Sequence, residues 1–139
     1  MELQRQYAKA AAAYNTAEKQ IAMNEQAFCT ASTATADLVK CEAALSQDRQ
    51  VTIAFDNAIR ALTFPAQHRG DVNKLLNDDG QLENALKQAS TAPSLSAINA
   101  LTAQIFSLLS TTSTDANRVR ADIGLQPASP PASPSTAPA

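Results

Sequence analysis

The sequence is poor in aromatic residues, in charge and in cysteine. It has no tryptophan, and aromatic residues make up 4% of its 139 residues, which leaves little surface on which bases or sugars could stack. The 11 basic and 13 acidic residues are well mixed and give a net charge of −2. Nucleic-acid binding is therefore not expected. No stretch approaches the run of about 18 apolar residues that a membrane span requires.

The motifs of common enzymes and cofactor sites are also missing. The sequence contains no HExxH, GxSxG, P-loop or dinucleotide-binding pattern. Its two cysteines cannot supply the four ligands of a structural zinc site, and they do not form C-x-x-C. We predict no enzymatic activity, no cofactor and no metal site.

An acidic stretch at residues 77–80, Asn-Asp-Asp-Gly, invites comparison with a calcium-binding EF-hand loop. Placing Gly80 at the sixth position puts Leu75 first and Leu86 twelfth, where the loop needs oxygen ligands. The match fails at both ends, so we interpret the stretch as a solvated helix segment.

Apolar residues recur at intervals of three and four over most of the chain, which predicts amphipathic helices. We expect helices at about residues 2–28, 36–62, 65–89 and 95–122, joined by short corners rich in Ser, Thr and Pro. Heptad-like spacing and short corners are typical of an all-α, up-down-up-down four-helix bundle. We assign the bundle to residues 1–125, and residues 126–139, rich in Pro, Ala and Ser, to a disordered tail.

Several residues refine this prediction. The first helix is expected to bury a seam of Leu3, Tyr7, Ala10, Tyr14, Ala17, Ile21, Asn24 and Phe28, and to expose Arg5, Lys9, Glu18, Lys19 and Glu25 on the opposite face. Asp48 interrupts the apolar seam of the second helix, and we expect it at the rim of the bundle or partly buried. Thr63 and Ser94 are predicted helix caps, Phe64 is expected to turn into the core, and Gly124 is a predicted helix end with Leu125 folding back on the last turn. Gly70 and Gly80 weaken the third helix, and we expect a kink or a short break at one of them, preferably at residues 77–80.

Cys29 and Cys41 lie on either side of the first corner, and we predict that they form a disulfide. Such a bond would stabilise the chain by roughly 3 kcal/mol in the chain-entropy model. The alternative is two buried free thiols, which behave as small apolar groups. A disulfide would favour an extracytoplasmic location and free thiols a cytoplasmic one. The first residues, MELQRQYAKA, lack the apolar core of a signal peptide, so the chain is either cytoplasmic or a mature fragment whose export signal is missing.

One group of motifs carries a family resemblance: Cys41 ahead of Asp48, Phe55 with AIRALTFP at 58–65, Asp71 with Leu-Leu at 75–76, and the segment 116–125 followed by the Pro/Ala/Ser tail. With these motifs the chain resembles uncharacterised exported, lipoprotein-type helical-bundle proteins of actinobacterial type. The resemblance implies an extracytoplasmic helical bundle and supplies no catalytic residues.

We therefore predict a non-enzymatic extracytoplasmic module for protein interaction, sensing or envelope association. Its partner would be an unknown protein or envelope component, and its oligomeric state stays open. The alternative is a carrier that holds a small hydrophobic ligand or haem between the helices. Such a carrier would need a cavity on which Tyr7, Tyr14, Met23 or His68 converge. An enzyme would need at least two of four titratable residues in one pocket: Asp48, His68, Asp71 and Asp79.

Overall fold

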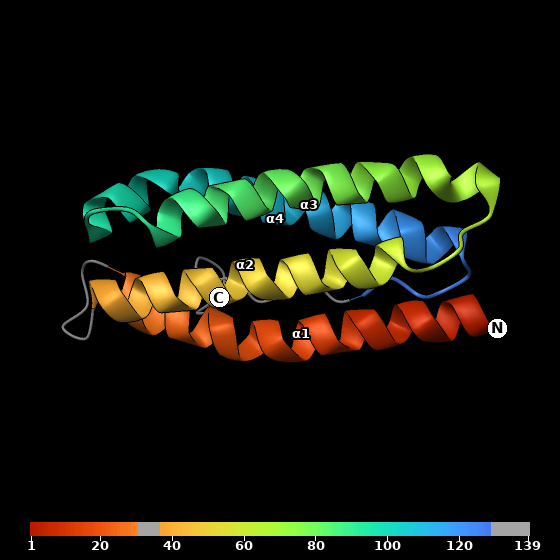
Figure 1. Cartoon of the computed structure of the whole chain (residues 1–139), viewed down its shortest axis with the longest axis horizontal. Coiled ribbons are helices and arrows are strands. Elements are labelled where there is room, and N and C mark those ends of the chain that lie inside the picture. Colours follow the sequence, from red (N-terminus) through yellow and green to blue (C-terminus); the bar gives the residue numbers. More distant parts are fainter. Residues whose placement is uncertain (31–36, 129–139) are drawn as a thin grey trace.

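The predicted all-α, up-down-up-down four-helix bundle is confirmed. The computed structural model describes residues 1–30 and 37–128. Within them the chain forms four long α-helices and one short 3-10 helix, namely α1 (Glu2–Cys29), α2 (Leu38–Arg60), η1 (Ala66–His68), α3 (Arg69–Ser90) and α4 (Leu95–Asp122). Consecutive helices run in opposite directions along one axis (Figure 1). Most of the first predicted corner and of the predicted tail lies outside the described residues.

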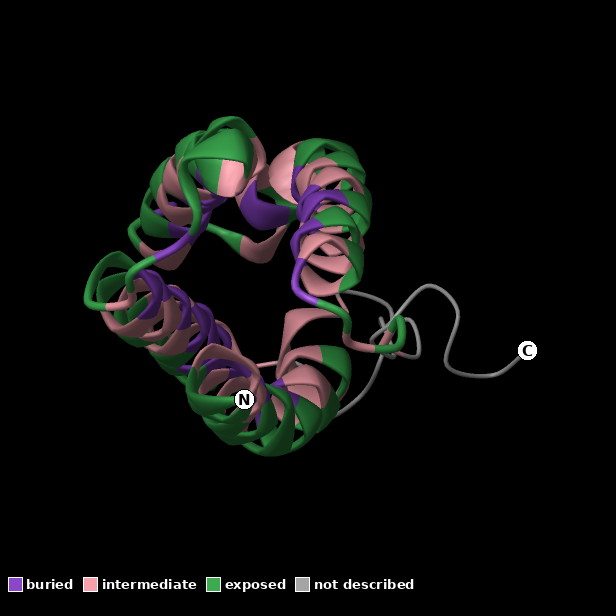
Figure 2. Cartoon of the chain, turned by 90° about the vertical axis from the view of Figure 1, so that its right-hand side faces the viewer, coloured by how far each residue is buried: buried purple, intermediate pink, exposed green. Residues whose placement is uncertain are grey.

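The core divides into two apolar clusters separated by a polar layer. One cluster lies at the Cys41 end of the bundle and includes Leu45, Leu82, Leu86 and Ile98. The other lies at the opposite end and is built on Tyr7, Ile59, Phe64, Leu75, Val119 and their neighbours. The buried polar residues fall between the two clusters along the helices: Glu18, Asp48, Thr52, Asp56, Asp79, Thr112 and Asp115. The view along the bundle shows buried residues facing its interior (Figure 2).

The helix ends of α4 follow their local signals. The Ser94 side chain accepts a hydrogen bond from the Ala97 amide at 3.1 Å, as an N-cap does. Gly124 has φ +83°, and the Leu125 amide donates to the Arg120 carbonyl at 2.8 Å. This is the left-handed glycine ending in which the next apolar residue folds back on the helix. The predictions for Ser94, Gly124 and Leu125 are confirmed.

The start of the third helix differs from the prediction. Phe64 is buried, as expected, but Thr63 caps nothing, because α3 begins only at Arg69, after η1. The predicted break near residues 77–80 is wrong, since α3 runs without interruption through Gly70 and Gly80. A mid-helix glycine costs about 1 kcal/mol. The buried face of α3, with Leu75 before Gly80 and Leu82 after it, offsets that cost.

Candidate functional site

The interior of this bundle holds an unusual number of acidic side chains. Among the residues that the structure describes, five carboxylic acids are less than 10% exposed: Glu18, Asp48, Asp56, Asp79 and Asp115. Burying an ionised carboxylate is costly unless it is paired with a cation or well hydrogen-bonded. The surroundings of each acid therefore indicate what the polar layer is able to do.

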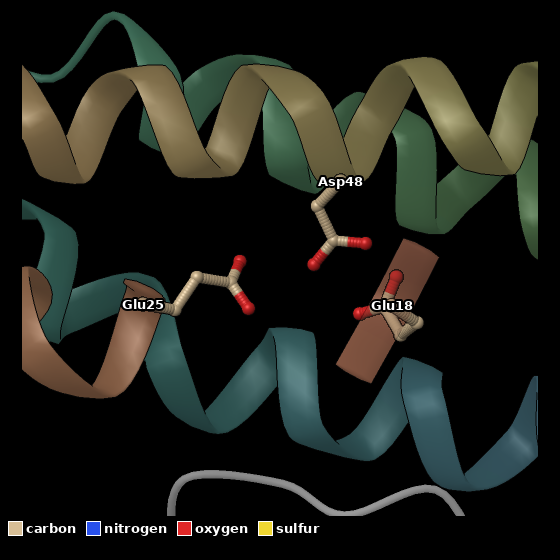
Figure 3. A group of neighbouring side chains, drawn as sticks. All are labelled: Glu18, Glu25 and Asp48. Carbon is tan, nitrogen blue, oxygen red and sulfur yellow. The ribbon is translucent and has the colours of Figure 1, made fainter. Parts of the chain in front are cut away.

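Three of the acidic side chains meet between α1 and α2. Glu18 and Glu25 both project from α1, and Asp48 projects from α2 (Figure 3). One carboxylate oxygen from each lies within 4.8 Å of those of the other two. Glu18 and Glu25 are seven residues, or about two helical turns, apart, so both lie on the face of α1 that meets α2. We call Glu18, Glu25 and Asp48 the three-carboxylate cluster.

The cluster is closed off from solvent on its Asp48 side. Asp48 is 1% exposed and Glu18 is 7% exposed, whereas Glu25 is half-buried. Asp48 Oδ1 and Glu18 Oε2 are buried, and no N–H or O–H group of the described residues donates a hydrogen bond to either. The three carboxyl groups can hydrogen-bond one another only when a proton is present, because ionised carboxylates are acceptors alone.

Electrostatics within the cluster favour the protonated forms when no cation is bound. Burial raises the pKa of Glu18, and the charge of Asp48 raises it further. Burial followed by Asp48 raises the pKa of Glu25 in the same way. Burial also raises the pKa of Asp48, while hydrogen bonds with Glu25 and Glu18 lower it. No lysine or arginine contributes to these three shifts within the described part of the chain.

A second acidic group, between α2 and α3, is arranged differently. Burial, and then a hydrogen bond with Asp79, raises the pKa of Asp56 to about 8, and the positive charge of Arg60 opposes this rise. Burial raises the pKa of Asp79 to about 6 and that of Glu83 to about 7. Basic side chains thus lie near this group, unlike the three-carboxylate cluster.

Asp115, on α4, has a basic partner of its own. Lys74 Nζ lies 3.3 Å from Asp115 Oδ1 and 2.7 Å from Asp78 Oδ2. The lysine thereby joins α3 to α4 and supplies the positive charge that a buried carboxylate needs. Among the groups of buried acids in the described residues, the three-carboxylate cluster is the one to whose pKa shifts no basic side chain contributes.

The two tyrosines line a small cavity that also includes Asp79 and Arg120, on the side where α4 barely touches α1. Its volume is about 80 Å³. The Tyr7 hydroxyl donates to the Ala116 carbonyl at 3.4 Å, and burial raises the pKa of Tyr7 to about 12. Tyr7 therefore acts as a core residue whose hydroxyl has a partner.

The predicted disulfide between Cys29 and Cys41 is confirmed. The bond joins the last residue of α1 to the first turn of α2, and the two Cα atoms are 4.9 Å apart. Next to it, the Asp37 amide donates to the Phe28 carbonyl at 3.1 Å. Both contacts hold the ends of the α1–α2 hairpin together.

Of the four titratable residues singled out from the sequence, His68 and Asp71 both lie beside Asp122, whereas Asp48 and Asp79 lie elsewhere. Asp48 belongs to the three-carboxylate cluster and Asp79 to the second acidic group. His68 Nδ1 lies 3.5 Å from Asp122 Oδ2 at the far end of the bundle, and Asp71 is close enough to raise the pKa of Asp122 after burial. Met23 is 63% exposed and does not line the tyrosine cavity.

The predicted exposure of Glu18 and Glu25 is wrong. The face of α1 that meets its neighbours includes Ala11, Glu18 and Glu25 at seven-residue intervals, beside the predicted seam. The heptad spacing of Ala11, Glu18 and Glu25 is visible in the sequence, but it does not show by itself that this face of α1 is buried. The sequence analysis did not bring these three acids together, because it had assigned two of them to the solvent face.

Comparisons with known protein families, with curated proteins and with solved structures find no match for this chain. Within the described residues, none of the helices combines the length and apolar character of a membrane span. The functional conclusion therefore depends on the disulfide and on the geometry of the core.

Proposed function

We propose that this chain is a non-enzymatic, extracytoplasmic helical-bundle module that serves protein interaction, sensing or envelope association. The observation that carries the proposal is the disulfide between Cys29 and Cys41. Structural disulfides form and persist in oxidising compartments and are rare where thioredoxin and glutathione keep thiols reduced. Both cysteines of the sequence take part in the bond. The resemblance to exported lipoprotein-type bundles points in the same direction.

The size and surroundings of the tyrosine cavity favour this proposal over a ligand carrier. Sites for small molecules and cofactors usually enclose about 300–1,000 Å³. The cavity that Tyr7 and Tyr14 line together encloses about 80 Å³, and a second hollow beside Tyr14 encloses about 240 Å³. A hollow of about 390 Å³ beside Phe64 and Val72 includes none of the four residues expected to hold a ligand. The volume of the cavity between the two tyrosines suits a few water molecules rather than haem, and neither Met23 nor His68 lines that cavity.

The separation of the candidate acid–base residues favours a module without catalytic activity. His68 and Asp71 lie beside Asp122 at one end of the bundle, outside the tyrosine cavity, whereas Asp48 and Asp79 lie in the polar layer between the apolar clusters. Catalysis by a nucleophile and base, or by an acid and base, requires the two groups within hydrogen-bond reach of one substrate.

The state of the thiols in the native host tests the proposed location. Cells are quenched in acid, the protein is unfolded in guanidinium, and thiols are alkylated before or after reduction, followed by intact-mass measurement. Unfolding is needed because Cys41 is fully buried and burial alone would protect a free thiol. We expect no alkyl groups before reduction and two after it. Two alkyl groups before reduction would contradict an extracytoplasmic location.

A further inference from the structure

We propose that the three-carboxylate cluster of Glu18, Glu25 and Asp48 is a binding site for one divalent cation, and that Ca²⁺ is the ion it fits best. The inference does not depend on the cellular location proposed above. It rests on the geometry of the three oxygens, on the burial of two carboxylates without a donor, and on the chemistry of the ligands.

The geometry allows one ion to contact all three side chains. Their oxygens lie within 4.8 Å of one another. Calcium binds oxygen at about 2.4 Å, so two ligands on opposite sides of the ion are about 4.8 Å apart. The carboxylates of Glu18, Glu25 and Asp48 point toward a common centre in Figure 3. Little side-chain movement is required to coordinate an ion there.

The burial of Asp48 and Glu18 calls for a positive charge that the described chain does not provide. Asp48 is 99% buried with Oδ1 lacking a donor, and Glu18 is 93% buried with Oε2 lacking a donor. An uncompensated buried carboxylate is strongly destabilising. Each of the other buried acidic groups of the described chain has a basic side chain nearby, Lys74 for Asp115 and Arg60 for Asp56. A bound cation would give the three-carboxylate cluster the same compensation.

The ligand set selects a hard cation. All three ligands are carboxylates, and oxygen-only sites suit Ca²⁺, Mg²⁺ and Mn²⁺ rather than zinc or copper. Mg²⁺ keeps several of its waters, whereas Ca²⁺ accepts bidentate carboxylates and irregular geometry. Water has access mainly from the half-buried side of Glu25. Three bidentate carboxylates would supply six oxygens, which meets the lower end of the coordination number of Ca²⁺.

Calcium-dependent stability of the chelator-treated full chain tests the site. Thermal unfolding is followed by circular dichroism in EDTA, and then in CaCl₂ or MgCl₂ up to about 1 mM, the range of weak extracellular calcium sites. We expect the unfolding temperature to rise with CaCl₂ and to level off, as binding to the folded state alone requires. Calorimetric titration of the same sample should give a stoichiometry of one.

Variants separate this site from general binding to acidic residues. Asp48→Asn and Glu25→Gln should each abolish the calcium-induced rise. In EDTA they should unfold at the same temperature as the parent chain or higher, since a neutral amide replaces a carboxyl group that, without a cation, is either protonated or an uncompensated buried charge. Two matched controls should keep the full rise: Glu42→Gln on the same helix as Asp48, and Glu83→Gln in the second acidic group. Glu25 is half-buried, so its variant remains informative if Asp48→Asn fails to fold.

Two results would overturn the proposal. One is that all three salts, CaCl₂, MgCl₂ and MnCl₂, give neither a heat of binding in the calorimetric titration nor a rise in the unfolding temperature. The other is a calcium response that persists in folded Asp48→Asn and Glu25→Gln, because the ion would then bind elsewhere. Saturable binding of Mg²⁺ or Mn²⁺ in preference to Ca²⁺ would overturn the choice of ion.

Discussion

Reduction of the Cys29–Cys41 disulfide is expected to lower the free energy of unfolding by about 3 kcal/mol. The two cysteines are 12 residues apart in the sequence. In the chain-entropy model, closing a loop of that size removes about 9.5 cal/mol/K from the unfolded chain, which is about 2.8 kcal/mol at 25 °C. The cross-link acts on the unfolded state, so the expected loss depends on loop length rather than on contacts in the folded bundle.

The folded state should change little when the bond is reduced. Cys41 is fully buried in the apolar cluster that includes Leu45 and Leu82. Two free thiols remain small apolar groups and leave no cavity at that position. Reduction is therefore a cleaner perturbation than Cys41→Ala, which would also remove buried sulfur.

Urea unfolding followed by far-UV circular dichroism measures this loss, with oxidised and reduced chains compared under the same conditions. We expect a lower urea midpoint on reduction and a thermal midpoint lower by about 10 °C, as follows from about 3 kcal/mol in a chain of this length. In the double variant Cys29→Ala/Cys41→Ala, the reductant should change neither the urea midpoint nor the thermal midpoint. Equal stability of the oxidised and reduced chains, within about 0.5 kcal/mol, would refute the loop-entropy reasoning.

Two further predictions concern the glycines and the buried acids. Gly80→Ala should stabilise the bundle by about 1 kcal/mol, because Gly80 lies inside α3 and an added Cβ meets nothing within 4 Å. Gly124→Ala should destabilise it, since φ is +83° and the Cβ would lie 2.8 Å from Gln4 Nε2. Shifts of the urea midpoint in the same direction for both variants would contradict this contrast. Burial raises the pKa of Asp56 from 3.8 to about 8, so the folded chain holds a proton there that the unfolded chain releases. Stability should therefore fall as pH rises from about 4 to 8, by up to about 1.4 kcal/mol per pH unit for one proton, and Asp56→Asn should flatten urea midpoints measured across that range; an unchanged slope in the variant would contradict the assignment.

The helical architecture follows from local signals in the sequence. Apolar residues at intervals of three and four, together with Ser94 and Gly124 at the two ends, gave the bounds of α4 correctly. The disulfide was predictable because Cys29 and Cys41 flank the first corner. The break near Gly80 was predicted wrongly, since the propensity of one residue was weighed without the packing of Leu75 and Leu82 on either side of it.

The three-carboxylate cluster could be predicted only in part. Asp48 was visible as an interruption in an apolar seam. Glu18 and Glu25 were not, because an acidic residue at heptad spacing suits a solvated face equally well. Their burial depends on how α1 is rotated against α2, which is a property of tertiary packing. The same holds for Asp56, which lies two turns beyond Asp48 on α2.

Terbium luminescence tests most directly whether a cation belongs in the core. Tb³⁺ replaces Ca²⁺ in oxygen-ligand sites and emits when a neighbouring tyrosine absorbs light. Tyr14 lies one turn from Glu18 on α1, the charges of Glu18 and Asp48 contribute to its raised pKa after burial, and the sequence has no tryptophan to compete. We expect sensitised emission that Ca²⁺ displaces, that Asp48→Asn abolishes and that Glu42→Gln retains. Absence of emission from the folded chain, or equal emission from folded Asp48→Asn, would contradict a cation site between α1 and α2.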